Sequence, residues 1–197
     1  FMGRPAQFSR DEAVTIAMDA FWTKGYDAVS VSELSEAMSI TRSSFYNCFK
    51  TREALFDDVL ALYMRTAPDY FLTSLDVDAP IVPAIRQALK NLCGDRGADP
   101  DARGCMVINC LAQVSVADAA APQLVAVMES KIERYESLLN EAAKRGEIGP
   151  CADARTTAEL IVTHMMGINL ICKIVRSEEQ LWQSSELFLA SIGLGVK

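Results

Sequence analysis

Six polar side chains near residue 45 have types and spacing that suit contacts with nucleic acid. They are Thr41, Arg42, Ser43, Ser44, Tyr46 and Asn47. An arginine can pair with a guanine edge and an asparagine with adenine, whereas hydroxyl groups suit phosphate contacts that set register. The pattern therefore predicts one helix face that contacts a DNA duplex. The alternative is a solvated helix face in a bundle that binds something else.

Two short predicted helices hold these side chains. Ser30 can cap the first helix, with Glu33 three residues later completing a capping box. The apolar residues of this helix recur on one face, at Val31, Leu34 and Met38. A break at residues 39–41 leads into the second helix, in which Phe45 and Phe49 form the buried pair. Two short helices joined by a tight turn match the helix-turn-helix unit, whose second helix enters the major groove.

The run RSSFYNCFKTREAL, residues 42–55, resembles the TetR family of bacterial transcriptional regulators. A tyrosine stands three residues before a phenylalanine, and a basic residue and a leucine open the next helix. Ser35 and Ser39 depart from the family's usual Ala and Gly; if the turn is left-handed, Ser39 costs about 1 kcal/mol relative to Gly. The resemblance implies DNA contacts at Tyr46 and Arg52. It also implies a two-fold interface of the last two helices and a repressor released by a ligand, although an activator stays possible.

The charge balance is unusual for a protein that binds DNA. The net charge is −7, and the first 67 residues hold seven basic and nine acidic side chains. Phosphate binding needs a local basic face and not a basic total. Five arginines and lysines lie near the predicted DNA face: Arg4, Arg10, Arg42, Lys50 and Arg52. We expect the acidic residues Asp11, Glu12, Asp19 and Asp27 to point elsewhere.

Periodicity along the chain predicts an all-α protein of about nine helices. The predicted helices cover residues 9–24, 30–38, 41–49, 51–66, 81–93, 104–116, 122–145, 152–176 and 178–192, with a polar loop at 94–103. We expect a DNA-binding domain at 1–52, with a short arm at 1–8, and an effector and dimerisation domain at 53–197. The helix that starts at Thr51 offers free N–H groups to a phosphate, beside Arg52. Its far end enters the second domain, so it could carry a signal between the domains.

The last two predicted helices suggest a homodimer. Residues 160–175 are apolar on nearly every side, so they must be buried on nearly every side. This predicts burial against a second subunit, with Gly167 allowing close helix approach; the alternative is an ordinary intrachain core. A dimer would also read two half-sites about 34 Å apart on a pseudo-palindromic operator.

An effector pocket is predicted where polar residues interrupt apolar helices. The candidate lining residues are Cys105, Met106, Asn109, Gln113, Tyr135, His164 and Met165, with Thr163 and Asn169 as further polar positions. Each of them could instead be an ordinary core residue. We expect a small apolar or electrophilic effector.

The cysteines and the single histidine leave two alternatives open. Gly104-Cys105 with Asn109 four residues on resembles regulators that sense electrophiles, so Cys105 could be a reactive thiol. Cys105 with His164 could also form a nucleophilic pair, but no nucleophile signature surrounds either residue. A third possibility is a ligand binder whose head contacts protein.

The composition also indicates where the chain works. Six cysteines without a CxxC pair and a single histidine predict reduced thiols and no metal site or cofactor. No apolar run approaches the 18 or so residues of a membrane span, and no signal peptide is visible. We expect a cytoplasmic protein that is not an enzyme.

Overall fold

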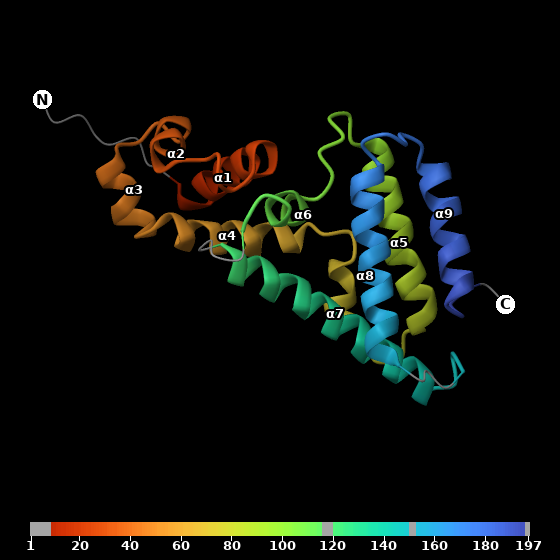
Figure 1. Cartoon of the computed structure of the whole chain (residues 1–197). Coiled ribbons are helices and arrows are strands. Elements are labelled where there is room, and N and C mark those ends of the chain that lie inside the picture. Colours follow the sequence, from red (N-terminus) through yellow and green to blue (C-terminus); the bar gives the residue numbers. More distant parts are fainter. Residues whose placement is uncertain (1–8, 116–119, 150–152, 196–197) are drawn as a thin grey trace, which may run out of the picture. The chain divides into compact units, whose positions relative to one another are not determined.

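The computed structural model describes residues 9–115, 120–149 and 153–195. Within these ranges the chain forms nine α-helices and one 3₁₀ helix, without a β-strand (Figure 1). The predicted all-α class is confirmed. The chain divides into two compact units. The first contains the residues up to Thr66 together with Met106–Leu124, and the second contains Ala67–Cys105 and the residues from Val125 onward. The expected boundary after residue 52 separates DNA binding from effector binding and dimerisation, whereas these units are defined by packing. That boundary therefore stays a prediction.

The first unit contains the three helices of the predicted DNA-binding domain, called the head below, together with two more. They are α1 (Arg10–Lys24), α2 (Val31–Ala37), α3 (Arg42–Phe49), α4 (Arg52–Arg65) and α6 (Met106–Leu111). A serine or threonine precedes each of the first four, at Ser9, Ser30, Thr41 and Thr51. Each side chain accepts a hydrogen bond from the backbone N–H three residues later, at 3.0–3.4 Å. Four capped starts explain why such short helices begin where the sequence predicts.

An aromatic cluster fills the core of the first unit. The ring of Phe21 lies 5.6 Å from Tyr26 and 5.0 Å from Phe56, and Tyr26 lies 4.5 Å from Phe56. All three side chains are buried. They join the end of α1 to α4, and α1 also packs against α6. Helix α2 packs against α1, and α3 packs against α4, so both short helices are held by this core.

The second unit is a layer of long helices. It contains η1 (Tyr70–Ser74), α5 (Ile81–Ala98), α8 (Ala154–Ile171), α9 (Glu178–Ser191) and most of α7 (Ala121–Lys144). Helix α5 packs against both α8 and α9 (Figure 1). The Glu147 carboxylate accepts hydrogen bonds from the backbone N–H groups of Ile81 and Val82, at 3.0 and 2.9 Å. This contact caps α5, which has no capping side chain of its own.

Three predicted helix ends were wrong. Helix α5 continues into the expected loop at 94–103 and ends at Ala98, α6 ends at Leu111, and α8 ends at Ile171. Gly97 explains the first error, because a Cβ there would lie 2.7 Å from the backbone nitrogen of Glu178. Glycine is therefore used inside α5 for the close approach of α9 and does not mark a helix stop.

Two expectations about the chain's surroundings can be compared with the described residues. None of their helices combines the length and the hydropathy that a bilayer crossing requires. No disulfide joins the five cysteines within the described ranges, which are Cys48, Cys93, Cys105, Cys110 and Cys172.

Candidate nucleic-acid interface

The start of α2 is fixed by reciprocal hydrogen bonds. Ser30 Oγ accepts from the N–H of Glu33 at 3.2 Å, and Glu33 Oε2 accepts from the N–H of Ser30 at 2.9 Å. These hydrogen bonds hold the pKa of the Glu33 carboxyl below its ordinary value. Beyond the end of α2, Ser39 has a φ of 55°. The left-handed backbone conformation that was considered for Ser39 is therefore present. It sets the direction in which the chain enters α3.

One face of α3 is buried and the other is polar and exposed. Phe45 and Phe49 are 0% and 2% exposed, so they hold the helix on the head. Thr41 Oγ1 accepts from the N–H of Ser44 at 3.1 Å and fixes the helix start. The exposed side chains are those the sequence predicted: Thr41, Arg42, Ser43, Ser44, Tyr46 and Asn47. The geometry gives α3 a free polar surface.

Tyr46 is the largest side chain on this surface. It is 49% exposed, and its ring meets the buried ring of Phe45 edge to face at 5.5 Å. The contact restrains the ring and leaves Tyr46 on the exposed side. Lys50, absent from the predicted contact set, follows α3 directly and donates from Nζ to the Asn47 carbonyl at 3.0 Å. Its position as the first basic residue after α3 is the sequence feature that could have added it to the predicted DNA contacts.

Arg52 is engaged within the head. Its guanidinium lies 4.0 Å from the ring centroid of Tyr26, and Nη1 donates to the carbonyls of Val29 at 2.8 Å and Tyr26 at 3.4 Å. Arg52 therefore ties the connection between α1 and α2 to the start of α4. A phosphate contact, as the family resemblance implies, would have to share this side chain with a structural role.

Ion pairs leave a local basic surface despite the acidic total. Arg10 pairs with Asp58 at 2.5 Å and Lys24 with Glu33 at 3.3 Å. Arg42 and Lys50 form no ion pair with any residue in the described ranges. Three of the acidic residues expected to point elsewhere, Asp11, Glu12 and Asp19, are carried by α1 and not by α3, and Asp27 is in the connection that follows α1. Arg4 lies outside the described residues.

The predicted effector residues are divided between the two units. Met106, Asn109 and Gln113 belong to the first, and Cys105, Tyr135, His164 and Met165 belong to the second. Gln113 is exposed, and a Cβ at Gly25 would lie 1.6 Å from its Oε1. Gln113 therefore lies against the end of α1. The prediction that Gln113 lies within an apolar helix was wrong, because α6 ends before this residue.

Tyr135 belongs to a buried polar cluster of the second unit. Its side chain is fully buried, and its hydroxyl donates to Asp69 Oδ2 at 3.3 Å. Lys131 Nζ reaches the same oxygen at 2.5 Å. Burial raises the pKa of the Tyr135 hydroxyl well above its usual value. Tyr135 is therefore a neutral hydrogen-bond donor that joins α7 to the segment before η1.

His164 and Met165 are neighbours in sequence with different surroundings. The imidazole of His164 stacks on Phe188 at 4.2 Å, and its Nε2 lies 3.0 Å from Ser185 Oγ. Burial lowers the pKa of His164. Met165 is 5% exposed and belongs to the core of the second unit. His164 therefore contacts α9.

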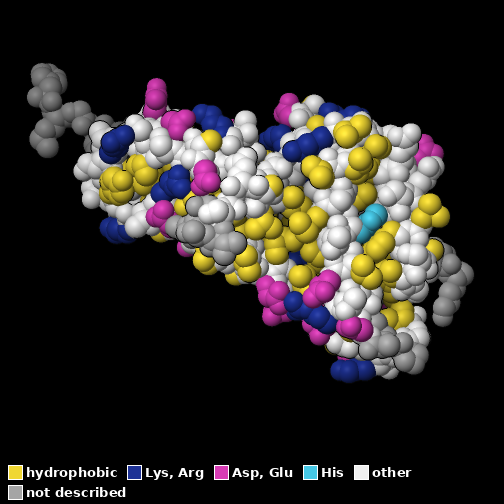
Figure 2. All heavy atoms as spheres, viewed as in Figure 1, with side chains coloured by type: hydrophobic (Ala, Val, Ile, Leu, Met, Phe, Trp, Pro, Cys, Tyr) yellow, Lys and Arg dark blue, Asp and Glu magenta, His cyan; other side chains and the backbone are white. Residues whose placement is uncertain are grey.

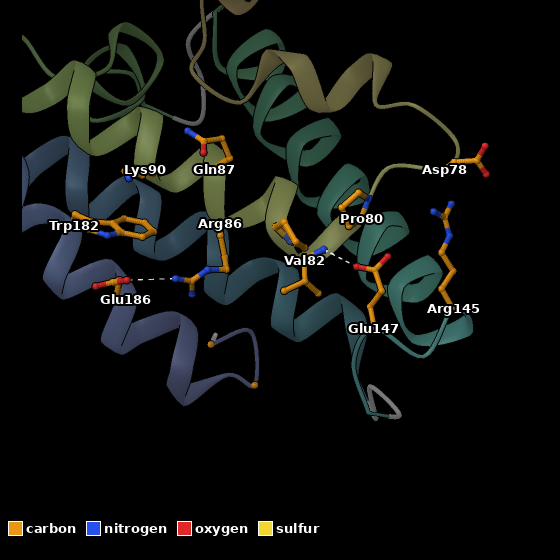
Figure 3. Close-up of a pocket in the computed structure, with 13 residues that line it drawn as sticks. Asp78, Pro80, Val82, Arg86, Gln87, Lys90, Arg145, Glu147, Trp182 and Glu186 are labelled. Carbon is orange, nitrogen blue, oxygen red and sulfur yellow. Dashed lines mark hydrogen bonds and ion pairs between the residues drawn. The ribbon is translucent and has the colours of Figure 1, made fainter. Parts of the chain in front are cut away.

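A groove of about 920 Å³ runs along α5 and α9 (Figure 3). Val82 and Trp182 line it, and Arg86 pairs with Glu186 across it at 3.3 Å. None of the seven predicted effector residues lines this groove. The described residues also contain no group of three His, Cys, Asp or Glu side chains that could hold a metal ion.

A polar recognition helix on a buried aromatic base, preceded by a capped helix and a tight turn, defines a helix-turn-helix regulator. Residues 14–59 match the model for bacterial regulatory proteins of the tetR family. Residues 83–188, more than half of the 197-residue chain, match the tetracyclin repressor-like C-terminal domain. The chain belongs to the TetR family.

Named relatives agree with this assignment. The chain is 27% identical over 183 residues to the HTH-type transcriptional repressor ComR of Escherichia coli (strain K12), covering 92% of this chain and 87% of ComR. It is 32% identical over 106 residues to the repressor BdcR of the same strain, 54% of each chain. A cysteine-substituted form of the TetR-family regulator CifR, solved with 26-bp operator DNA, matches with a TM-score of 0.83 and 27% identity, covering 96% and 99% of the two chains.

Proposed function

We propose that this TetR-family regulator represses transcription by binding operator DNA as a homodimer, and that a small-molecule effector releases it. One observation carries the proposal: α3 exposes a row of polar side chains above the buried Phe45 and Phe49. This segment lies within the part of the chain that matches the TetR DNA-binding model. The relatives ComR and BdcR are named repressors, and CifR was solved on its operator.

The exposed residues of α3, together with the capping residues of α2 and α3, divide into two proposed roles. Arg42 and Asn47 have the donors that read guanine and adenine edges in the major groove. The hydroxyl groups contact phosphates and set the register; they come from Ser30, Thr41, Ser43, Ser44 and Tyr46. Arg52 acts mainly by holding the head together, and the start of α4 offers its free N–H groups to a phosphate.

An apolar stripe on α8 supports the homodimer. Leu160, His164, Gly167 and Ile171 on α8, and Ile174 in the turn that follows it, recur at alternating spacings of four and three residues, the pattern of a helix-pairing seam. Leu160, Ile171 and Ile174 are 46%, 41% and 79% exposed. Figure 2 shows hydrophobic side chains gathered around the single histidine on this face. Apart from the adjacent backbone of α8, no atom of the described residues lies within 4 Å of a Cβ built on Gly167, so a second helix has room to approach there.

Release requires only that the effector binds the released state better than the DNA-bound state. A coupling free energy of about 1–3 kcal/mol changes operator affinity roughly 5- to 150-fold. Thiol sensing through Cys105 is not needed for this account, and neither is an enzymatic role for Cys105 with His164. The regulator would act in the cytoplasm, where its operator is.

Selection from random 40-bp duplexes with the full-length protein tests the proposal. We expect an inverted repeat whose half-site centres are separated by about 10–10.5 bp or a multiple of it. The complex should contain an even number of subunits, and its affinity should fall steeply with salt. Enrichment of no sequence, or of a single asymmetric site bound by one subunit, would contradict the proposal.

A further inference from the structure

A nearly buried guanidinium lies in the second unit with a neutral partner. Arg96, in the last turn of α5, is only 7% exposed. Its Nε donates to Asn169 Oδ1 of α8 at 2.5 Å. Within the described residues, no carboxylate forms an ion pair with Arg96 and no other acceptor bonds to it. Four of its five N–H donors therefore have no partner within the described residues, and their nitrogen atoms are not fully enclosed, so a ligand can reach them.

The partner of Arg96 is held in a fixed orientation. Asn169 is 6% exposed, and its Nδ2 donates to the backbone carbonyl of Met165 at 2.8 Å. The amide oxygen of Asn169 is thereby turned toward Arg96. An amide oxygen accepts a hydrogen bond but supplies no negative charge, so the charge of the guanidinium is not neutralised.

Buried arginines are normally paired, because burying an isolated charge is costly. The carboxyl end of α5 supplies a partial negative charge, which is weaker than a counterion. Asp99, the nearest acidic residue along the chain with a buried side chain, accepts from the backbone N–H groups of Asp101 and Arg103 and lies 3.8 Å from the Arg103 side chain. Arg96 is therefore a cation prepared for an anion that the described chain does not contain.

We propose that Arg96, positioned by Asn169, binds the carboxylate of a small organic acid, and that this acid is the effector. A guanidinium and a carboxylate form two parallel charge-assisted hydrogen bonds. Leu92 and Met165 precede Arg96 and Asn169 by four residues, so each lies on the same helix face as its polar neighbour. Both are apolar and buried in the core of the second unit, and the flexible thioether of Met165 can move to admit an apolar tail. This inference rests on the proposed function, since it names the chemistry of the effector.

Ligand binding to the free protein tests the site without DNA. We would measure the melting temperature of the full-length protein with sodium propionate, hexanoate or benzoate at constant ionic strength. Hexanamide and benzamide, which keep the shape and lose the charge, are the matched neutral probes. We expect at least one acid to raise the melting temperature, and neither amide to do so. Equal effects of acids and amides, or no effect of any acid, would overturn the proposal.

Two substitutions locate the effect. Arg96→Gln should weaken acid binding about tenfold or more, because it removes the charged fork. Asn169→Asp keeps Arg96 and places a carboxylate at the position that now contacts Nε; this internal counterion should also abolish the acid response. Arg86→Gln is the control, because Arg86 lies on the same helix and is already paired with Glu186. An acid response that persists in Asn169→Asp and Arg96→Gln, or that disappears in Arg86→Gln, contradicts the assignment.

The same acid should then release the protein from a duplex obtained by selection. Wild-type protein should lose affinity for this duplex in the acid, whereas Arg96→Gln should bind it equally with and without the acid. Failure to bind any duplex would count against the proposed function alone, because the melting experiment requires no DNA. An acid that binds wild-type protein without changing its DNA affinity would refute the effector role.

Discussion

The guanidinium of Arg52 lies over the ring of Tyr26, 4.0 Å from its centroid, and donates to the Val29 carbonyl at 2.8 Å. The pair joins the connection before α2 to the first turn of α4. Because α2 and α3 are short, their orientation depends on such contacts more than on their own stability. The position that the family resemblance links to DNA is therefore also a structural fastening of the head.

Replacing Arg52 by alanine should destabilise the protein as well as weaken DNA binding. The variant loses a cation–π contact worth about 0.5–2 kcal/mol and backbone hydrogen bonds to a charged group worth about 1.5–3 kcal/mol, partly replaced by water. We expect the free energy of unfolding in urea to fall by roughly 1–3 kcal/mol. Lys50→Ala is the control and should change it by less than about 0.5 kcal/mol. Equal stabilities of the two variants would show that Arg52 has no structural role.

The single histidine gives the protein a pH-dependent stability. Burial lowers the pKa of His164 in the folded state, so the unfolded chain binds the proton more readily. Stability should be fully present above the unfolded pKa of about 6.5 and should decrease as the pH falls from there toward the folded pKa. Urea unfolding from about pH 5 to 7.5 should show a steeper dependence for wild type than for His164→Gln. Superimposable pH profiles would contradict this prediction.

A leucine at Gly167 should separate dimerisation from folding. A Cβ at this position meets no other element within the described part of the chain, and replacing a helical glycine favours the helix by up to about 1 kcal/mol. The isolated subunit should therefore stay folded, while the added side chain fills the space left for a second α8. We expect sedimentation velocity to show at least tenfold weaker dimerisation.

The control for Gly167→Leu is Ser137→Leu, which adds the same side chain at an exposed position of α7. It should leave dimerisation unchanged. A Gly167→Leu dimer as tight as wild type would place the subunit interface on another face.

Local patterns in the sequence were sufficient to predict the head. Capping residues at Ser9, Ser30, Thr41 and Thr51 mark helix starts through hydrogen bonds that span only three residues. The buried pair Phe45 and Phe49 likewise fixes which side chains of α3 are exposed. These features depend on neighbours in sequence, and sequence patterns report such features well.

Features that depend on distant neighbours could not be predicted. The sequence alone predicts Gly97 to be a loop residue, because the close packing of the start of α9 against it is visible only in the structure. Arg52 reads as a free cation until Tyr26 and Val29, more than 20 residues earlier, are brought beneath it. The burial of Arg96 could not be predicted either, because its partner Asn169 lies 73 residues later in the sequence, on another helix. Each of these three features depends on a tertiary contact, and no local sequence pattern reports such a contact.

The most direct test of the account is the affinity of Arg42→Ala/Asn47→Ala for a selected inverted repeat and for an unrelated duplex, measured by fluorescence anisotropy at one salt concentration. Lys90→Ala removes a positive charge from an exposed position of α5 and is the control. Since a good base contact contributes about 1–3 kcal/mol of discrimination, the double variant should lose at least about tenfold in the ratio of the two affinities. Its free energy of unfolding should match wild type, because both side chains are exposed. A ratio equal to that of wild type and Lys90→Ala would contradict the claim that α3 reads the operator.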